Sequence, residues 1–114
     1  MAYYLIDTDV MVDLSRGISA AATYVDSLDG VTISIITAQE LIVGARNQRD
    51  ASVIDKLIRT FPVHSELRPE ITWLAYDLVR RHNKPDGLRT FDALIAATAI
   101  AEGLKLVSRN RKHF

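Results

Sequence analysis

The chain contains no cysteine in its 114 residues. Disulfide bridges and thiolate metal sites are therefore excluded. The histidines, His64, His82 and His113, also lack the short spacings that are typical of histidine metal sites. A metal ion bound by this protein would need oxygen ligands.

The sequence also lacks a long apolar run. No segment approaches the roughly 20 consecutive apolar residues that a transmembrane helix requires. The N-terminal segment MAYYLIDTD turns acidic after six residues, which is not typical of a secretory leader. We therefore expect a cytoplasmic protein without a membrane partner. Apolar residues make up 48% and charged residues 25% of the chain, which are ordinary values for one globular domain.

The sequence has no excess of positive or negative charge, because its 14 Lys/Arg and 14 Asp/Glu residues balance. Zero net charge at first argues against a nucleic-acid partner, since proteins that bind phosphates usually carry a basic surface. The charges are segregated along the chain, however. Residues 1–79 carry 6 Lys/Arg and 11 Asp/Glu, whereas residues 80–114 carry 8 and 3, a net charge of +5. This basic segment offers candidate phosphate contacts, although a solvated surface explains it as well. The candidates are Arg80, Arg81, Lys84, Arg89, Arg109, Arg111 and Lys112.

The spacing of apolar residues predicts strands that alternate with helices. Strands are expected at 3–6, 31–35 and 104–107, with a brief extended segment at 61–63. Helices are expected at 9–17, 20–28, from 37 onward, and at 51–60, 69–81 and 91–102. In the helix at 69–81, Trp73 and Tyr76 are expected to help cover the core. Segment 82–89 is rich in turn-forming residues and is expected to be a loop. The alternation predicts an α/β fold, with a mostly parallel central sheet of four to five strands flanked by helices on both faces.

Three carboxylates stand where parallel sheets bind ligands, beyond the carboxyl ends of the strands. Asp7 follows the first strand, Glu40 is expected in the first helical turn after the second strand, and Asp92 in the first turn of the last helix. Glu40 could instead complete a capping box with Thr37, and Asp92 could interact with the helix dipole. Together, the three acids would repel one another unless a cation neutralised them. We therefore expect Mg²⁺, with Mn²⁺ possible, and phosphodiester hydrolysis by an activated water.

Beyond these patterns, the chain resembles a PIN domain, specifically the VapC-type toxins of bacterial toxin–antitoxin pairs. The resemblance lies in LIDTDVMVDL at 5–14, TAQELIVGA at 37–45, FDALIAATAIAEGLKLVSRN at 91–110 and the terminal HF. It implies a single PIN-like domain over residues 1–114, whereas many members continue with a further short C-terminal strand. It also implies that Asp7, Glu40 and Asp92 bind Mg²⁺ and activate water for RNA cleavage, and that an antitoxin binds the protein.

The chain departs from this family at one position. A further acidic or polar residue usually follows the last core strand, and here Ser108 and Asn110 are the candidates, neither of them a carboxylate. The site could therefore hold one metal ion or two. Thr8 and Asp9 belong to the first motif and could support the ligands, although Asp9 also fits the N-cap of the first helix. Asp13 is expected to be a solvated helix residue.

Other interpretations stay open. Asp7-Thr8-Asp9 also resembles the start of haloacid-dehalogenase-like phosphatases, but the later lysine and paired acids of that family are absent. A non-catalytic PIN-like or receiver-like binding module would explain the missing fourth carboxylate. The family commonly forms homodimers, and several apolar residues could provide a dimer surface or ordinary core packing: Ile42, Val43, Ile54, Leu57, Ile58 and Ile71.

Overall fold

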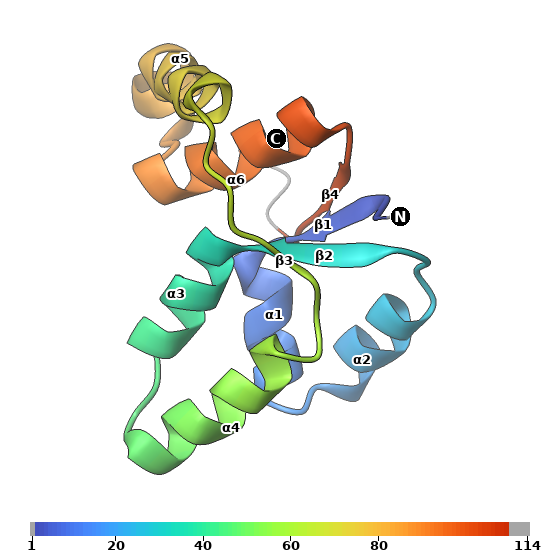
Figure 1. Ribbon diagram of the computed structural model, residues 1–114. Coiled ribbons are helices and arrows are strands. Elements are labelled where there is room, and N and C mark those ends of the chain that lie inside the picture. The colour runs from blue at the N-terminus through green and yellow to red at the C-terminus, as the bar shows by residue number, and fades with distance from the viewer. Residues whose placement is uncertain (1, 110–114) are drawn as a thin grey trace.

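A computed structural model describes residues 2–109, except for the side chains of Pro85 and Asp86. Strands and helices alternate along this part of the chain, which confirms the α/β fold class (Figure 1). The strands are β1 (Tyr4–Ile6), β2 (Val31–Ser34), β3 (Val63–His64) and β4 (Lys105–Val107). The helices are α1 (Thr8–Ser15), α2 (Ser19–Asp26), α3 (Ile35–Val43), α4 (Gln48–Ile58), α5 (Pro69–Asp86) and α6 (Thr90–Glu102).

The four described strands form one parallel sheet in the order β3-β2-β1-β4. Its register pairs Leu5 of β1 with Thr32 of β2 on one side and with Leu106 of β4 on the other. From β1 the chain builds outward through β2 and β3, and it then returns to add β4 on the opposite side. Ligands of open parallel sheets bind at such a reversal, outside the carboxyl ends of the strands.

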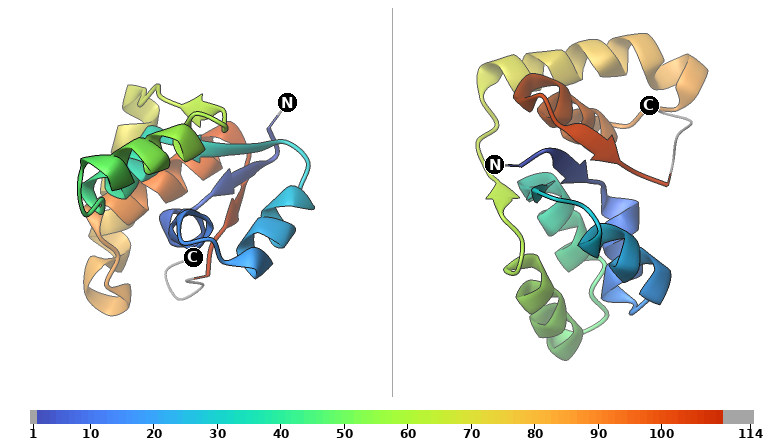
Figure 2. Two further views of the ribbon diagram at one scale, coloured as in Figure 1. Left: turned by 90° about the horizontal axis from the view of Figure 1, so that it is seen from below. Right: turned by 90° about the vertical axis from the view of Figure 1, so that its right-hand side faces the viewer.

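Helices cover both faces of the sheet, as predicted. Helices α1 to α4 lie on one face and α5 and α6 on the other (Figures 1 and 2). Successive side chains of a strand point to opposite faces. Leu5 accordingly packs with Ile95 and Ala99 of α6, whereas Ile6 packs with Met11 of α1. Leu5 and Ile6 are both fully buried, so β1 is the centre of the core.

The segment predicted as a loop, 82–89, is mostly helical, because α5 continues to its position 86. Gly87 ends the helix with φ 70°, and its N–H donates to the carbonyl of Asn83. The N–H of Leu88 donates to the carbonyl of His82, and the Leu88 side chain is only 2% exposed. A left-handed glycine followed by a buried apolar residue terminates a helix favourably. The turn-forming residues therefore occupy the last helical turn.

The aromatic residues of α5 do not cover the core, so that prediction is wrong. Trp73 is 66% exposed and Tyr76 is 57% exposed. The opposite face of α5, with Ile71 and Ala75, packs against α6. Within the described residues, no helix is long and apolar enough to cross a lipid bilayer.

The apolar residues considered for a dimer surface divide between core and surface. Ile54, Ile58 and Ile71 are buried in the core. On α3, Ile42 is 41% exposed and Val43 is 85% exposed. Leu57 is partly buried, so Ile42 and Val43 are the exposed members of this set.

Candidate active site

Asp7 is held at the carboxyl ends of two neighbouring strands. It is the residue after β1 and the N-cap of α1, and its N–H donates to the carbonyl of Val107 in β4 (2.9 Å). Its side chain is buried. Oδ1 accepts a hydrogen bond from the N–H of Thr8 (2.8 Å), and Oδ2 accepts one from the Ser108 hydroxyl (2.8 Å). The carboxylate is thereby fixed at the point where the strand order reverses.

The electrostatic surroundings of Asp7 favour a cation. Burial raises the pKa of the Asp7 carboxyl above its ordinary value, while the hydrogen bonds from Ser108 and Thr8 act in the opposite direction. The negative charges of Asp9 and Asp92 raise this pKa further. The charge of Asp92 has the smallest of these effects on Asp7. A cation at this position would relieve the repulsion and keep Asp7 ionised.

Two threonine hydroxyls orient Glu40. The Thr8 hydroxyl donates to Oε1 of Glu40 (2.7 Å), and the hydroxyl oxygens of Thr8 and Thr37 are 3.1 Å apart. Thr37 is fully buried one helical turn before Glu40. Thr98, which is also fully buried, donates instead to the Leu94 carbonyl of its own helix (2.8 Å). The hydroxyl of Thr37 is thus directed across to α1, where it supports the Thr8–Glu40 hydrogen bond.

The capping box predicted for Thr37 and Glu40 is wrong. Helix α3 begins at Ile35, and the hydroxyl of Ser34 accepts from the N–H of Ile36 (3.0 Å). Because Ser34 is also the last residue of β2, the helix follows the strand without a connecting loop. Glu40 consequently lies in the second turn of α3 and not in its first.

Helix α1 holds the segment after β4 through two acidic residues. Asp9 is not the N-cap, since Asp7 takes that place; its Oδ2 accepts from the N–H of Arg109 (3.0 Å) and from the Ser108 hydroxyl (3.3 Å). Asp13, one turn later, forms an ion pair with Arg109 (Nε to Oδ2, 3.3 Å), and its side chain is only 14% exposed. The prediction that Asp13 is solvated is therefore wrong. Together, the two acids keep Ser108 beside Asp7.

Asp92 lies in the first turn of α6, as predicted, and is half-buried. Within residues 2–109, no three histidine or acidic side chains are placed closely enough to hold one metal ion between them. The chemistry of the donors nevertheless fits a hard divalent ion. Asp7, Glu40 and Asp92 all offer carboxylate oxygens, and the pKa of Asp7 is raised by burial first and by neighbouring negative charges second.

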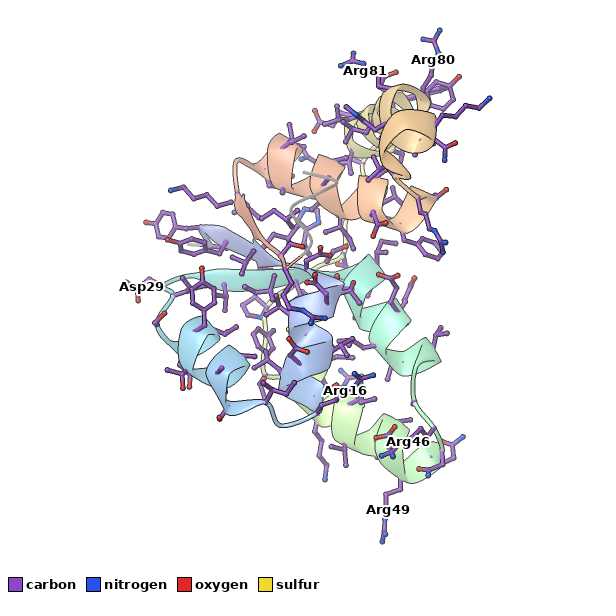
Figure 3. All side chains as sticks on the ribbon, turned by 180° about the vertical axis from the view of Figure 1, so that it is seen from behind. Arg16, Asp29, Arg46, Arg49, Arg80 and Arg81 are labelled. Carbon is purple, nitrogen blue, oxygen red and sulfur yellow. The ribbon has the colours of Figure 1, made fainter. Side chains whose placement is uncertain are left out.

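The basic candidates fall into two groups. Arg80 and Arg81 extend outward from α5, at the edge of the molecule away from the sheet (Figure 3), and Lys84 is exposed on the same helix. Arg89 is the N-cap of α6 and precedes Asp92 by three residues, whereas Arg109 contacts Asp9 and Asp13 of α1. The last candidates, Asn110, Arg111 and Lys112, lie outside the described residues.

Comparison with known proteins identifies the family. The family model named PIN domain matches residues 4–114. The chain belongs to the PIN domain family. Ribonuclease VapC10 from Mycobacterium tuberculosis is 34% identical over 114 residues, which cover 96% of this chain and 84% of that protein. Ribonuclease VapC1 from Methanocaldococcus jannaschii is 31% identical over 112 residues, which cover 96% and 77%.

Two solved structures contain chains with the same fold. A toxin–antitoxin complex from Klebsiella pneumoniae contains a chain with a TM-score of 0.83 and 28% identity, covering 97% of this chain and 89% of that one. FitAcB from Neisseria gonorrhoeae gives a TM-score of 0.77 at 24% identity, covering 97% and 90%, and supports the fold alone. PIN-domain nucleases of the VapC group generally depend on a divalent metal ion. The family excludes the phosphatase and receiver-like interpretations.

Proposed function

We propose that this PIN domain is a metal-dependent endoribonuclease and the toxin of a toxin–antitoxin pair. Asp7, Glu40 and Asp92 would hold the divalent ion, which we expect to be Mg²⁺ in the cell, with Mn²⁺ as a substitute. The main support is the Asp7 carboxylate at the carboxyl ends of β1 and β4, whose pKa burial raises and whose two oxygens accept hydrogen bonds from Thr8 and Ser108. Further support comes from Glu40, which is hydrogen-bonded to the residue that follows Asp7.

The residues of the chain then have distinct parts in hydrolysis. Ser108 and the N–H of Thr8 hold the Asp7 carboxylate in one orientation, and the Thr8 hydroxyl does the same for Glu40. A bound divalent ion would lower the pKa of a water molecule and stabilise negative charge on the phosphate oxygens. Arg89, exposed at the N-cap of α6, would contact a neighbouring phosphate of the RNA.

An antitoxin is the second proposed partner. The related Klebsiella chain was solved in a toxin–antitoxin complex. In this chain, a groove between α1, α3 and α4 has Val12, Leu41 and Ile54 in its lining and reaches Glu40. An amphipathic helix could lie there and direct a basic side chain to the acids. Such binding would both neutralise the site and exclude RNA from it.

A homodimer in the cytoplasm is the proposed working state. Ile42 and Val43 on α3 line a shallow apolar depression together with Ala38 and Val63. Apolar surface of this kind marks interaction sites on soluble proteins. We expect a second copy to cover it, with the active sites remaining open to RNA.

Cleavage of RNA by the purified, antitoxin-free chain tests the nuclease function. Structured and unstructured RNA are incubated with Mg²⁺, Mn²⁺ or chelator, and the products are separated on a gel. We expect metal-dependent cleavage that Asp7→Asn and Asp92→Asn abolish. Asp29→Asn is the matched control, because Asp29 is exposed at the opposite end of the sheet (Figure 3) and should leave cleavage unchanged. A folded, metal-binding wild type that cuts no RNA would favour a non-catalytic binding module.

A further inference from the structure

The outer face of α5 exposes a pair of aromatic rings. Trp73 and Tyr76 are 66% and 57% exposed, and their ring centroids lie 5.4 Å apart at an interplanar angle of 76°. In this edge-to-face contact each ring fixes the orientation of the other, while most of the surface of both side chains stays exposed to solvent. The helix cannot turn these rings inward, because its opposite face is packed against α6 through Ile71 and Ala75.

Cationic side chains continue the same face toward the end of the helix. Arg80 follows Tyr76 by four residues and Lys84 follows Arg80 by four, so the stripe lies on one side of the helix. Both are exposed. Asp77 is an exposed acid beside them, whereas Glu70, at the start of the helix, forms an ion pair with Arg68. The C-terminal half of this face is thus basic and its middle is aromatic.

This combination matches the chemistry of single-stranded nucleic acids. Unpaired bases stack on exposed aromatic rings, and lysine or arginine side chains next to the rings contact the phosphates. Base pairs within a duplex do not offer free faces for such stacking. An aromatic and basic stripe therefore favours unpaired RNA over duplex RNA.

We propose that Trp73, Tyr76, Arg80 and Lys84 form a second RNA-binding surface, which receives unpaired bases of the RNA that is cut at the acidic site. The proposal rests on the proposed function, since it takes RNA as the substrate. The basic end of α5 leads through one short turn into α6, where Asp92 stands in the first turn. An RNA strand leaving the acidic site along this turn reaches the cations first and the rings next. The surface would thereby select RNA with an unpaired segment near the cleaved bond.

The single tryptophan of the chain provides a direct probe of this surface. Wild-type protein in chelator, which prevents cleavage, is titrated with a single-stranded RNA of about 16 nucleotides, the upper end of site sizes for comparable platforms. We expect saturable quenching of the Trp73 fluorescence, and much weaker quenching by the same sequence as a duplex. Quenching that rises with protein concentration in the absence of RNA would instead identify a second copy of this chain as the occupant and overturn the proposal.

Matched tyrosine variants test the surface without relying on tryptophan. Binding of a labelled RNA is measured by fluorescence anisotropy for Tyr76→Ala and for Tyr24→Ala, because Tyr24 is 53% exposed on α2. Loss of one stacked base should weaken binding at least about fivefold. We expect this loss for Tyr76→Ala and for Trp73→Ala, with Trp73→Phe close to wild type and Tyr24→Ala unchanged. Equal binding by both tyrosine variants would overturn the proposal.

Binding and cleavage are measured separately, so the two proposals can fail independently. Binding of RNA through Trp73 by a chain that cuts no RNA would refute the nuclease function and support this surface. Cleavage of RNA by a chain whose binding is insensitive to Tyr76→Ala would support the nuclease function and refute this surface.

Discussion

Replacing Thr8 by valine should weaken metal binding without unfolding the protein. Valine has nearly the shape of threonine but lacks the hydroxyl that donates to Oε1 of Glu40 at 2.7 Å. A hydrogen bond to a charged group contributes about 1.5–3 kcal/mol. Loss of a residue that orients a metal ligand typically reduces metal affinity by about 10- to 100-fold. The two estimates agree, since about 1.4 kcal/mol corresponds to a factor of ten.

The assay is the affinity for Mn²⁺, measured by calorimetry, together with the Mg²⁺ concentration that gives half-maximal RNA cleavage. We expect both to shift by about 10- to 100-fold in Thr8→Val, whereas Thr8→Ser, which keeps the hydroxyl, should be close to wild type. Thr37→Val should have a smaller effect, because Thr37 acts on Glu40 through Thr8. For the same reason the double variant should be little worse than Thr8→Val alone.

Thr98→Val separates this effect from the general consequence of losing a buried hydroxyl. Thr98 is fully buried like Thr37, but it bonds a carbonyl of its own helix. This variant should therefore change stability and leave metal affinity unaltered. The reasoning would be refuted by a folded Thr8→Val protein whose metal affinity lies within about twofold of wild type, well short of the expected loss.

Two further predictions concern stability. Burial raises the pKa of Asp7 in the folded protein. Between the unfolded-state pKa and this higher folded-state pKa, the folded chain keeps a proton that the unfolded chain has lost. The stability of the metal-free protein therefore falls as pH rises through the folded-state pKa. In chelator at neutral pH, Asp7→Asn should unfold at a higher temperature than wild type, with the difference shrinking in acid; a lower unfolding temperature at neutral pH would contradict this. Leu88→Ala should reduce the free energy of unfolding by about 2–5 kcal/mol in urea titrations, because Leu88 is 2% exposed between α5 and α6. Ile100→Ala, at a 60% exposed position, is its control and should change that free energy by less than about 0.5 kcal/mol.

Local patterns in the sequence were sufficient for the fold class and for the places of Asp7 and Asp92 in the fold. A short apolar run that stops at Asp7 predicts a buried strand with a polar residue at its carboxyl end, and the structure has this arrangement. The apolar segment that starts near Asp92 likewise predicts α6. Such inferences succeed because the residues that decide them are neighbours in the chain. That the three acids jointly hold a metal ion stays a prediction.

Sequence patterns failed where a helix boundary depends on distant residues. Turn-forming residues predicted a loop after position 81, yet burial of Leu88 between two helices extends α5 beyond it. Thr37 and Glu40 have the spacing of a capping box, but Ser34 at the end of β2 caps the helix instead. In both cases tertiary packing or strand position outweighs a local preference.

The sequence by itself therefore determined which residue types could bind a metal ion and on which elements they stand. Only the tertiary structure decided how those side chains are held. Ser108 donates to Asp7 across 101 positions of sequence, and Thr8 donates to Glu40 across 32. Asp13, which has the pattern of a solvated helix residue, becomes the partner of Arg109. These contacts exist because the parallel register brings the carboxyl ends of β1 and β4 together, and no pattern of neighbouring residues encodes that register.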